Sequence, residues 1–399
     1  MPIPPLHSIS HGTLTMKNVA DILSTLQVES VTPHILRIPL DEPVTTPMGV
    51  VDSTIAVLVN VKTTSGEEGW GEVWCNFPRF GAYHRAVIVN KVIQPFLKSR
   101  SFAGPSEAFH AMHKAANVIR LQSGETGPFS AAIAGVDIAL WDIVGKREGL
   151  PIWKLLGGQS GSIQAYGSLG RSNGFEPLVE EGLQRGFRAF KLRCWGNPDQ
   201  HIDAYVKARA MVGPDVEIMA DANSSFPLEQ SVAWAQKFKD VGLAFLEEAI
   251  PVDSPLAAWQ ALAAAAPMKL AGGENMITAE TLTEAMHSGV YGVLQPDMTK
   301  FGGFSGLLGL SQQIVAKGIR FCPHMFSAAP GLLASAHLLA ASNSPDGSLE
   351  YGIEHNPPRD EFIQCEIVNG RMEIGDAPGL GLTLDAAKMD RYRVAVPTY

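Results

Sequence analysis

The chain has 399 residues, of which 46% are hydrophobic and 18% are charged, and its formal net charge is −9. This length favours two domains, or one large α/β barrel with an appendage, and the composition is typical of a soluble globular protein with ample core. The acidic balance and the lack of a Lys/Arg-rich run in the sequence argue against nucleic acid as a partner.

Residues 1–27 read as an N-terminal extension of unknown use. They contain no basic segment followed by an apolar core, so no signal peptide is expected. The longest apolar run, around "LAAWQALAAAAPM", is too short to span a membrane. The four cysteines are far apart, which predicts reduced thiols in a cytoplasmic protein and neither a disulfide framework nor a zinc knuckle.

Residues 28–150 are predicted to form an α+β domain. Between Val28 and Asn76 the runs are rich in β-branched residues, as strands are, and "TTSGEEG" reads as a hairpin turn between two of them. Residues 85–148 have helical apolar spacing, with a stop near Gly149. Two unusual loops, 41–53 and 76–84, are expected to be functional or mobile.

From residue 151 a short apolar run alternates with a helical segment eight times, as far as residue 369. Such alternation predicts a parallel sheet, and eight units predict closure into a barrel. The runs are "IQAYGS", "AFKLRC", "EIMADA", "AFLEEA", "KLAGGE", "GVLQPD", "RFCPHM" and "LEYGIE".

Seven of these runs carry an ionisable residue at or near their C-terminal end. These residues follow one another at intervals of 23 to 30 residues, which is about the length of one strand–helix unit. Buried parallel strands are normally apolar throughout. Because barrel enzymes place their chemistry at the carboxyl ends of the strands, all seven side chains are expected at one mouth. They are Lys191, Asp221, Glu247, Glu274, Asp297, His324 and Glu350.

Asp221, Glu247 and Glu274 come from consecutive strands. Carboxylates held close together raise one another's pKa, and a divalent cation removes the conflict. An all-oxygen ligand set favours Mg²⁺ first and Mn²⁺ second. The alternative is that one or two of them form structural ion pairs with cations of the helices.

The motifs "ADAN", "LEEAIP", "GGEN", "QPDMTKFGG", "PHMF" and "LEYGIE", in this order and spacing, resemble the enolase superfamily in its mandelate racemase / muconate lactonizing enzyme branch. The resemblance implies a (β/α)7β modified TIM barrel with an N-terminal α+β capping domain. It implies Mg²⁺ ligation by Asp221, Glu247 and Glu274, and a C-terminal segment, 370–399, that returns to the cap. It also suggests a homo-oligomer, either a dimer or an octamer. Glu248 should point away from the mouth, because neighbouring strand residues alternate faces.

Roles for other residues of the mouth follow from the resemblance, for Asp297, His324 and Glu350, and from position in the sequence, for Lys300 and Asn223. Asp297 and His324 would form a dyad in which the carboxylate orients the imidazole and the imidazole moves a proton. Glu350 would donate a hydrogen bond to an enediolate, which requires a protonated carboxyl; an ordinary ion pair is the alternative. Lys300 would hold the dyad or a neighbouring carboxylate, unless it is solvated. Asn223 would contact a substrate hydroxyl or cap a turn.

"AFKLRCW" departs from the family pattern, which is Lys-x-Lys with the second lysine as a base opposite the histidine. Here that position is Arg193, which stays protonated and whose planar fork suits a carboxylate. Lys191 is expected to stabilise the substrate carboxylate electrostatically, and a perturbed lysine base there stays open. A racemase needs proton transfer on both faces of one carbon, whereas a dehydratase can use His324 alone. The substitution therefore favours elimination, even if Arg193 only pairs with Asp221 or Glu350.

The sequence thus predicts a Mg²⁺-dependent dehydratase, a hydro-lyase, acting on an acid sugar or related 2-hydroxy carboxylate. A racemase, epimerase or cycloisomerase of the same superfamily, or a non-catalytic metal-binding barrel, are the alternatives. Residues that could shape the substrate pocket are Trp74, Phe77, Arg79 and His84 of the cap, together with Cys194 and Trp195, for which plain packing is the alternative.

Overall fold

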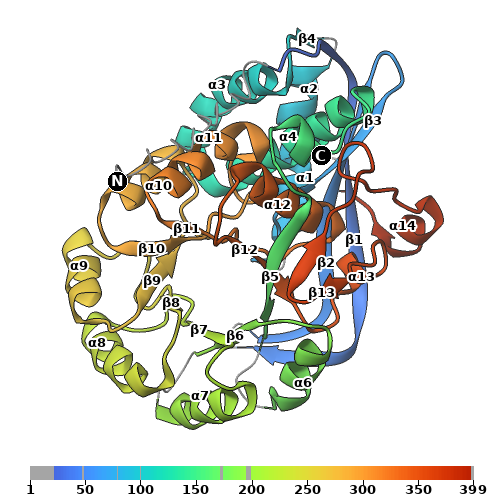
Figure 1. The fold of residues 1–399 in the computed structure, drawn as a ribbon. Coiled ribbons are helices and arrows are strands. Elements are labelled where there is room, and N and C mark those ends of the chain that lie inside the picture. Colours follow the sequence, from blue (N-terminus) through green and yellow to red (C-terminus); the bar gives the residue numbers. More distant parts are fainter. Residues whose placement is uncertain are drawn as a thin grey trace, which may run out of the picture.

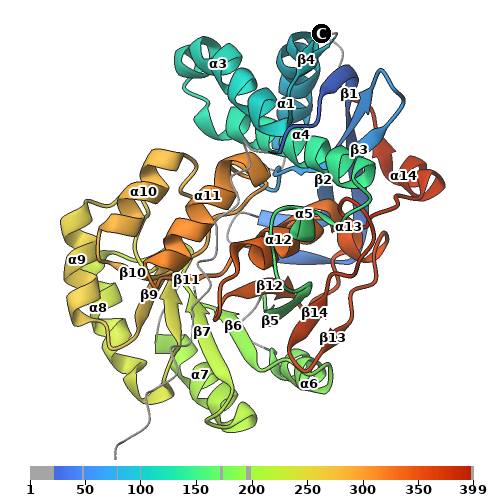
Figure 2. The same ribbon diagram turned by 45° about the horizontal axis from the view of Figure 1, so that its top comes forward.

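The computed structural model describes residues 22–46, 49–78, 80–98, 100–170, 174–194 and 199–396. Its two parts are a cap of long antiparallel strands and helices and a barrel of parallel strands ringed by helices (Figures 1 and 2). This confirms the predicted fold class. Most of the N-terminal extension and the candidate residues Arg79 and Trp195 lie outside the described residues.

The cap is built on an antiparallel meander. Strand β1 (Leu26–Thr46) pairs with β2 (Gly49–Thr63), which pairs with β3 (Glu68–Val73) through the predicted "TTSGEEG" turn. The expectation of a long loop at residues 41–53 is wrong, because most of this segment is paired as a hairpin arm. The pairing runs as far as Pro39, shifts in register between Pro39 and Val44, and then resumes. The residues within the shift are left out of the ladder, and the strand continues beyond them.

Helices of the cap pack on one face of this sheet. The chain runs through α1 (Gly81–Ile88), the π-helical η2 (Val89–Ile93), α2 (Gln94–Leu97), the short strand β4 (Ser101–Phe102), α3 (Pro105–Ser123) and α4 (Thr126–Arg147). Helix α4 lies directly against β3. A Cβ at Gly71 would collide with the backbone oxygen of Gly135, so only glycine allows this close approach.

Helix α4 is the longest apolar helix within the described residues. The run near Leu256, expected from the sequence to be the longest apolar run, forms a shorter helix. By length and composition it could cross a membrane: the mean hydropathy of its most apolar window is 1.4. Of that window, 89% is buried inside the protein, between β3, α3 and α11. A core helix passes the same composition test, and burial on all sides explains the apolar sequence.

Each of the eight predicted runs forms a strand of the barrel. Neighbouring strands pair in parallel in the order β11-β10-β9-β8-β7-β6-β5, and β12 pairs with β5. Seven inward-facing side chains, including Tyr166, Phe245 and Cys322, form a separate core inside it. The strands are β5 (Ser162–Ser168), β6 (Ala189–Arg193), β7 (Glu217–Asp221), β8 (Phe245–Glu247), β9 (Lys269–Gly272), β10 (Tyr291–Leu294), β11 (Arg320–Phe321) and β12 (Ser348–Gly352).

Helices connect these strands around the outside of the barrel (Figure 1). A single turn, α5 (Ile152–Leu155), precedes the first strand. The connecting helices are α6 (Glu176–Gln184), α7 (Asp199–Val212), α8 (Leu228–Lys237) with η3 (Lys239–Val241), α9 (Leu256–Ala265), α10 (Ala279–His287), α11 (Gly303–Ala316) and α12 (Ala329–Ser342).

The last segment connects the barrel with the cap. After α13 (Pro357–Asp360) and β13 (Ile367–Val368), strand β14 (Arg371–Glu373) pairs with β5 of the barrel. Helix α14 (Ala386–Tyr392) follows, and β15 (Arg393–Val394) pairs with β1 of the cap. All four cysteines are free thiols, as expected.

Candidate active site

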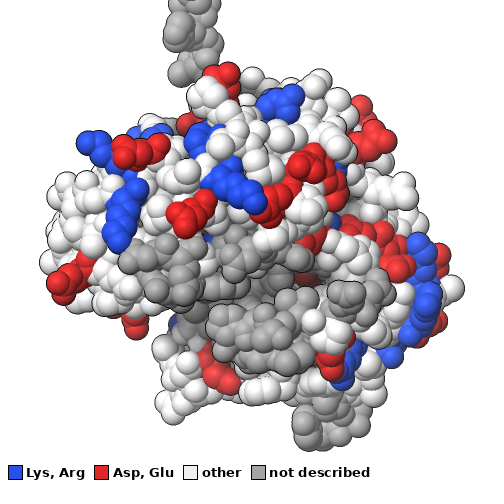
Figure 3. All heavy atoms as spheres, turned by 90° about the horizontal axis from the view of Figure 1, so that it is seen from below, with Lys and Arg blue, Asp and Glu red and all other residues white. Residues whose placement is uncertain are grey.

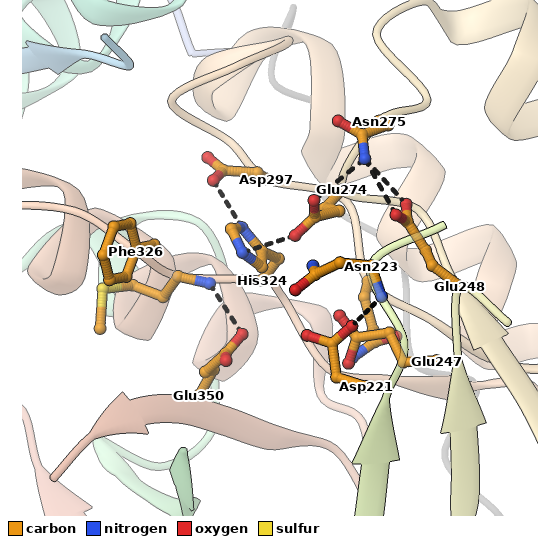
Figure 4. A network of polar contacts seen from close by, with 12 residues as sticks. Asp221, Asn223, Glu247, Glu248, Glu274, Asn275, Asp297, His324, Phe326 and Glu350 are labelled. Atoms are coloured by element: carbon orange, nitrogen blue, oxygen red, sulfur yellow. Dashed lines mark hydrogen bonds and ion pairs between the residues drawn. The ribbon is translucent and has the colours of Figure 1, made fainter. Parts of the chain in front are cut away.

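The seven ionisable side chains predicted at the barrel mouth surround one centre (Figure 4). Each of them is at most 9% exposed. Asp221 and Glu247 are the last residues of β7 and β8, and Glu274 follows β9 by two positions. The parallel register of the strands explains the convergence, because it brings their carboxyl ends to the same rim.

Lys191 lies among three carboxylates of this cluster. Its Nζ is 2.8 Å from Glu247 Oε2, 2.8 Å from Glu350 Oε1 and 3.5 Å from Asp221 Oδ2. Burial alone would lower the pKa of Lys191, but Glu247 and Glu350 raise it above its usual value. These carboxylates favour the charged form of Lys191, which argues against its use as a base.

Glu350 is a carboxylate in this arrangement and not the protonated hydrogen-bond donor that the resemblance implied. It accepts hydrogen bonds from Ser168 Oγ at 2.6 Å and from the backbone N of Met325 at 3.2 Å. Burial favours the neutral form, but Lys191 and then His324 lower the pKa of Glu350 to about 2. The ion pair with Lys191, which was the alternative, explains the difference.

Arg193 stands at the position of the second lysine of the family pattern. It lies opposite Asp221 in the β6–β7 ladder, and its guanidinium donates to Asp221 Oδ2 and, at 2.9 Å, to Asn223 Oδ1. Asn223 has a positive φ of 44°, and its backbone N donates to Asp221 Oδ1 at 2.9 Å. The guanidinium is thus held by two acceptors at the end of β6–β7.

His324 bridges two carboxylates. Its Nδ1 is 2.8 Å from Asp297 Oδ2, and its Nε2 is 2.7 Å from Glu274 Oε2. Thr299 supports the dyad, because its N and Oγ1 donate to Asp297 Oδ1 at 2.8 and 2.7 Å. Burial alone would lower the pKa of His324, but Glu274 and Asp297 raise it to about 10. Burial alone would raise the pKa of Glu274, because it disfavours the charged form, but the positive charges of His324 and Lys300 hold the pKa well below its usual value.

Glu248 points toward the cluster, contrary to the expectation. Strand β8 ends at Glu247, and the positive φ of 40° at Glu248 breaks the alternation of faces on which that expectation rested. Its carboxylate accepts from Ser224 Oγ and Asn275 Nδ2, each at 3.0 Å. Burial, followed by the charges of Glu274 and Glu247, raises the pKa of Glu248 to about 7.

Lys300 lies beside a carboxylate and is not solvated. Its Nζ is 3.6 Å from Glu274 Oε1 and 3.1 Å from Asn275 Oδ1. The same Nζ is 4.5 Å from the centre of the Trp74 ring, which places that cap side chain beside the barrel residues. Asn275 joins Glu248, Glu274 and Lys300, a role that only its place in "GGEN" could have suggested.

The three predicted metal ligands each contact a cation of the protein: Arg193, Lys191 or His324. Within the described ranges, no group of three or more His, Cys, Asp or Glu side chains is arranged to hold a metal ion as it stands. The donor chemistry nevertheless fits Mg²⁺, because all three are carboxylates. In addition, Glu247 Oε1 is buried without a hydrogen-bond partner, which is costly unless a cation satisfies it. The residues therefore fit a hard divalent ion.

Two exposed aromatic side chains lie on segments next to the mouth. Phe326, two residues after His324, is 52% exposed, and Asn76 Nδ2 of the cap donates to its carbonyl oxygen at 2.5 Å. Phe77 is 40% exposed, which suits a pocket wall. The surface in Figure 3 is hollowed near its centre, with acidic atoms visible in the hollow. Phe326 was missed, although an exposed aromatic beside "PHM" could have been noted.

Two other candidates have different surroundings. His84 on α1 lies 2.8 Å from Glu125 of the cap, an ion-pair partner away from the dyad. Cys194 is fully buried, and its N donates to Asp221 O at 2.8 Å, as expected for a packing residue at the end of β6.

Comparisons with known proteins cover nearly the whole chain. Residues 30–157 match the family model of the mandelate racemase / muconate lactonizing enzyme N-terminal domain, and residues 175–388 match that of the enolase C-terminal domain-like family. The chain is 28% identical over 389 residues to D-galactarolactone cycloisomerase of Agrobacterium fabrum, covering 93% of this chain and 100% of that protein. It is 29% identical over 347 residues to arabinonate dehydratase of Saccharolobus solfataricus, covering 84% and 90%. A crystal structure of a mandelate racemase/muconate lactonizing enzyme from Bordetella bronchiseptica RB50 superposes with a TM-score of 0.87 at 39% identity, covering 92% of this chain and 100% of that one.

Proposed function

The chain belongs to the mandelate racemase / muconate lactonizing enzyme family of the enolase superfamily, and from this premise we propose that it is a Mg²⁺-dependent dehydratase of an acid sugar or related 2-hydroxy carboxylate. The proposal rests on the contrast between two positions of the site. His324 is paired with Asp297 and can transfer a proton. At the position of the second base, Arg193 is bound to Asp221 and Asn223.

Asp221, Glu247 and Glu274 would hold the ion. When bound, Mg²⁺ supplies Lewis-acid stabilisation of negative charge on the carboxylate and α-hydroxyl of the substrate. Engagement of Glu274 in this ligand set would release His324 Nε2 from its ion pair. The imidazole would then be held by Asp297 alone, and its pKa would fall from about 10 towards the range in which a histidine transfers protons near neutral pH.

The proton transfers would be carried out by His324. Nε2 would take the α-proton while Nδ1 donates to Asp297 Oδ2, and the same Nε2 would return the proton to the departing β-hydroxyl as water is lost. The resulting enol becomes a 2-keto acid. Lys191, which is buried and paired with carboxylates, would stabilise the enediolate charge.

Arg193 is the reason to prefer elimination. A guanidinium does not give up its proton at any working pH, so it cannot deprotonate the second face of the α-carbon. Elimination needs one group that acts first as base and then as acid, and His324 suffices for both. The dehydratases among the relatives, such as arabinonate dehydratase, show that this reaction class occurs at this level of identity.

A cycloisomerase is the second candidate, favoured by the full-length match to D-galactarolactone cycloisomerase. Such a reaction also needs only one proton-transferring face. The products separate the two reactions: a 2-keto acid with loss of water supports the dehydratase, and an isomer of unchanged mass supports the cycloisomerase.

The test is a screen of mono- and diacid sugars with Mg²⁺ for 2-keto acid formation, followed by the His324→Asn variant on the best substrate. Loss of the proton-transfer group should lower kcat by about 10²–10⁴-fold. His287→Asn, which changes an exposed histidine on α10, is the matched control and should retain wild-type turnover. Full turnover by His324→Asn would refute the mechanism, and exchange of the α-proton with D₂O without 2-keto acid would favour a racemase.

A further inference from the structure

We infer that Glu72 of the cap is a positioning residue for the barrel: its carboxylate binds the start of helix α12 and thereby fixes the loop that carries His324. The kinetic part of this inference rests on the proposed function. The structural part does not, because it concerns hydrogen bonds within the chain.

Glu72 caps a helix of the other domain. Its side chain leaves β3 and is 4% exposed; Oε1 accepts from the backbone N of Ala328 at 2.7 Å, and Oε2 accepts from that of Gly331 at 2.8 Å. Helix α12 has Ala328 at its N-cap, so its own side chain cannot accept from the free N–H groups of the first turn. Glu72 supplies the oxygen atoms that Ser, Thr, Asp or Asn normally provides at this position.

The sequence of α12 leaves room for the carboxylate. A Cβ at Gly331 would lie 2.8 Å from Glu72 Oε2 and 2.6 Å from the Cβ of Ser327. Both distances are shorter than side-chain carbons tolerate, so a larger residue would displace the carboxylate or the loop. Glycine in the first turn of a helix is otherwise unfavourable, and the approach of Glu72 gives it a physical reason.

The loop held by Glu72 carries the catalytic imidazole. It runs from Cys322 to Ala328, with His324 bound to Asp297 and the backbone N of Met325 bound to Glu350. Near its end, Ser327 Oγ lies 3.3 Å from Thr299 Oγ1. Thr299 Oγ1 in turn donates to Asp297 Oδ1. The residue just before Ala328 is therefore connected to the carboxylate that orients His324.

Two further hydrogen bonds follow the same edge of the cap. The backbone N of Trp74 donates to Thr299 O at 3.3 Å, and Asn76 Nδ2 donates to Phe326 O. The segment from Glu72 to Asn76 therefore contacts both loops that carry the dyad. Among these contacts only those of Glu72 involve a buried ionisable group, and hydrogen bonds to a carboxylate are the stronger kind.

Asp137 of the cap repeats this arrangement one helix earlier. It is fully buried on α4, and its Oδ2 accepts from the backbone N of Ser305 at 3.0 Å, in the first turn of α11. Helix α11 follows the loop that carries Asp297. The cap thus binds the beginnings of both helices that follow the dyad loops.

A purely structural role is the alternative, and Asp142 provides the matched control. Asp142 is also a fully buried cap carboxylate with two backbone donors, Trp70 N at 2.9 Å and Leu380 N at 2.8 Å. Its Oδ2 also accepts from Lys146 Nζ at 2.7 Å; Trp70 and Lys146 belong to the cap and Leu380 to the C-terminal segment, so none of these contacts reaches the dyad loops. If Glu72 only held the domains together, Glu72→Gln should behave like Asp142→Asn: Tm should fall and kcat should change no more than in the control.

The experiment compares the full-length wild type, Glu72→Gln, Glu72→Asp and Asp142→Asn with Mg²⁺ at pH 8, above the pKa of Glu72, which burial raises to about 7. Both amide variants should lower Tm. Only Glu72→Gln should lower kcat, by up to about 10²-fold with little change in KM, because a small misplacement of catalytic groups has effects of this size. Glu72→Asp, which keeps the charge, should recover part of kcat.

A double-mutant cycle then separates positioning from stability. In the His324→Asn background, Glu72→Gln should cause no further loss of the residual rate, because both changes act through one group. Multiplicative losses would overturn the inference, as would an equal loss of kcat in Asp142→Asn and Glu72→Gln at equal loss of Tm.

A measurement that needs no substrate separates this test from the test of the proposed function. The low-field proton resonance of His324 Nδ1–H, assigned by its absence in Asp297→Asn, should shift or broaden in Glu72→Gln and stay unchanged in Asp142→Asn. If no acid sugar is turned over, the proposed function fails, while this resonance still decides the inference. Should Glu72→Gln not fold, Gly331→Ala disturbs the same carboxylate and must alter the resonance; an unchanged resonance would overturn the inference.

Discussion

Replacing Lys191 by Met tests whether the carboxylates of the barrel mouth form a cation site. Met is of similar length but carries no charge. The Nζ of Lys191 lies within 2.8 Å of both Glu247 and Glu350 and 3.5 Å from Asp221, and all four side chains are buried. Its removal leaves three carboxylates facing one another, and removal of one partner of a buried ion pair costs about 3–5 kcal/mol.

The cost converts into a change in melting temperature. Unfolding entropy is about 2.1 cal/mol/K per residue, so a chain of 399 residues that unfolds as one unit has about 0.8 kcal/mol/K. A loss of about 3–5 kcal/mol then corresponds to about 4–6 °C. We expect Lys191→Met to melt lower than the wild type by this amount in EDTA.

Mg²⁺ should reduce the difference in Tm between Lys191→Met and the wild type, because an ion bound by Asp221 and Glu247 would restore positive charge among the same carboxylates. The measurement is a thermal melt of both proteins in EDTA and across a MgCl₂ titration. Lys207→Met, which removes the cation of an exposed pair with Glu176, is the control and should shift Tm little, since surface pairs contribute about 0–1 kcal/mol. Coincident melts of Lys191→Met and wild type in EDTA, or a difference that MgCl₂ leaves unchanged, would refute the reasoning.

Two further predictions concern proton transfer and pH. Arg193→Lys places a titratable amine at the second-base position, so exchange of the substrate α-proton with D₂O should rise relative to dehydration in proton NMR; an unchanged ratio would contradict the role given to Arg193. His337 is buried and its Nδ1 accepts from the backbone N of Trp153 at 3.0 Å, and burial lowers its pKa from 6.5 to about 4. The unfolded state therefore takes up the proton first as the pH falls, so the free energy of unfolding should decrease between pH 6.5 and 4, by about 3 kcal/mol for this group. In urea titrations His337→Asn should show a weaker decrease over that range, and equal slopes for the two proteins would exclude His337 as the cause.

The barrel was predictable because its signal is periodic and local. Each strand is a short apolar run with its ionisable residue at the same phase, so the positions of Lys191, Asp221 and His324 could be derived from spacing alone. The hairpin between β2 and β3 was predictable for the same kind of reason, a turn composition between two β-branched runs.

The errors come from features that depend on where an element ends or on what packs against it. Glu248 was assigned to the wrong face because the sequence does not show that β8 ends one residue earlier, with a positive φ. The segment 41–53 looked like a loop, since the register shift between Pro39 and Val44 has no local signature in the sequence. Glu350 was expected to be neutral, but its ionisation depends on Lys191, which is 159 residues away in the chain and 2.8 Å away in space.

The register of the barrel explains what Arg193 does to the chemistry of this site. Residues 193 and 221 are direct neighbours in the parallel ladder of β6 and β7, so any long cation at 193 faces the carboxylate at the end of the next strand. A lysine there could lose its proton and act as a base, whereas the guanidinium keeps its charge and spans Asp221 and Asn223 at once. The substitution thus exchanges a proton-transfer group for a fixed positive charge beside a predicted metal ligand. His324 follows β11, three strands further around the barrel than Glu247, and under the proposed function it would be the one proton-transfer group of the site. Such a site would support elimination or cycloisomerisation, which need one proton-transferring face, and would not support racemisation, which needs two.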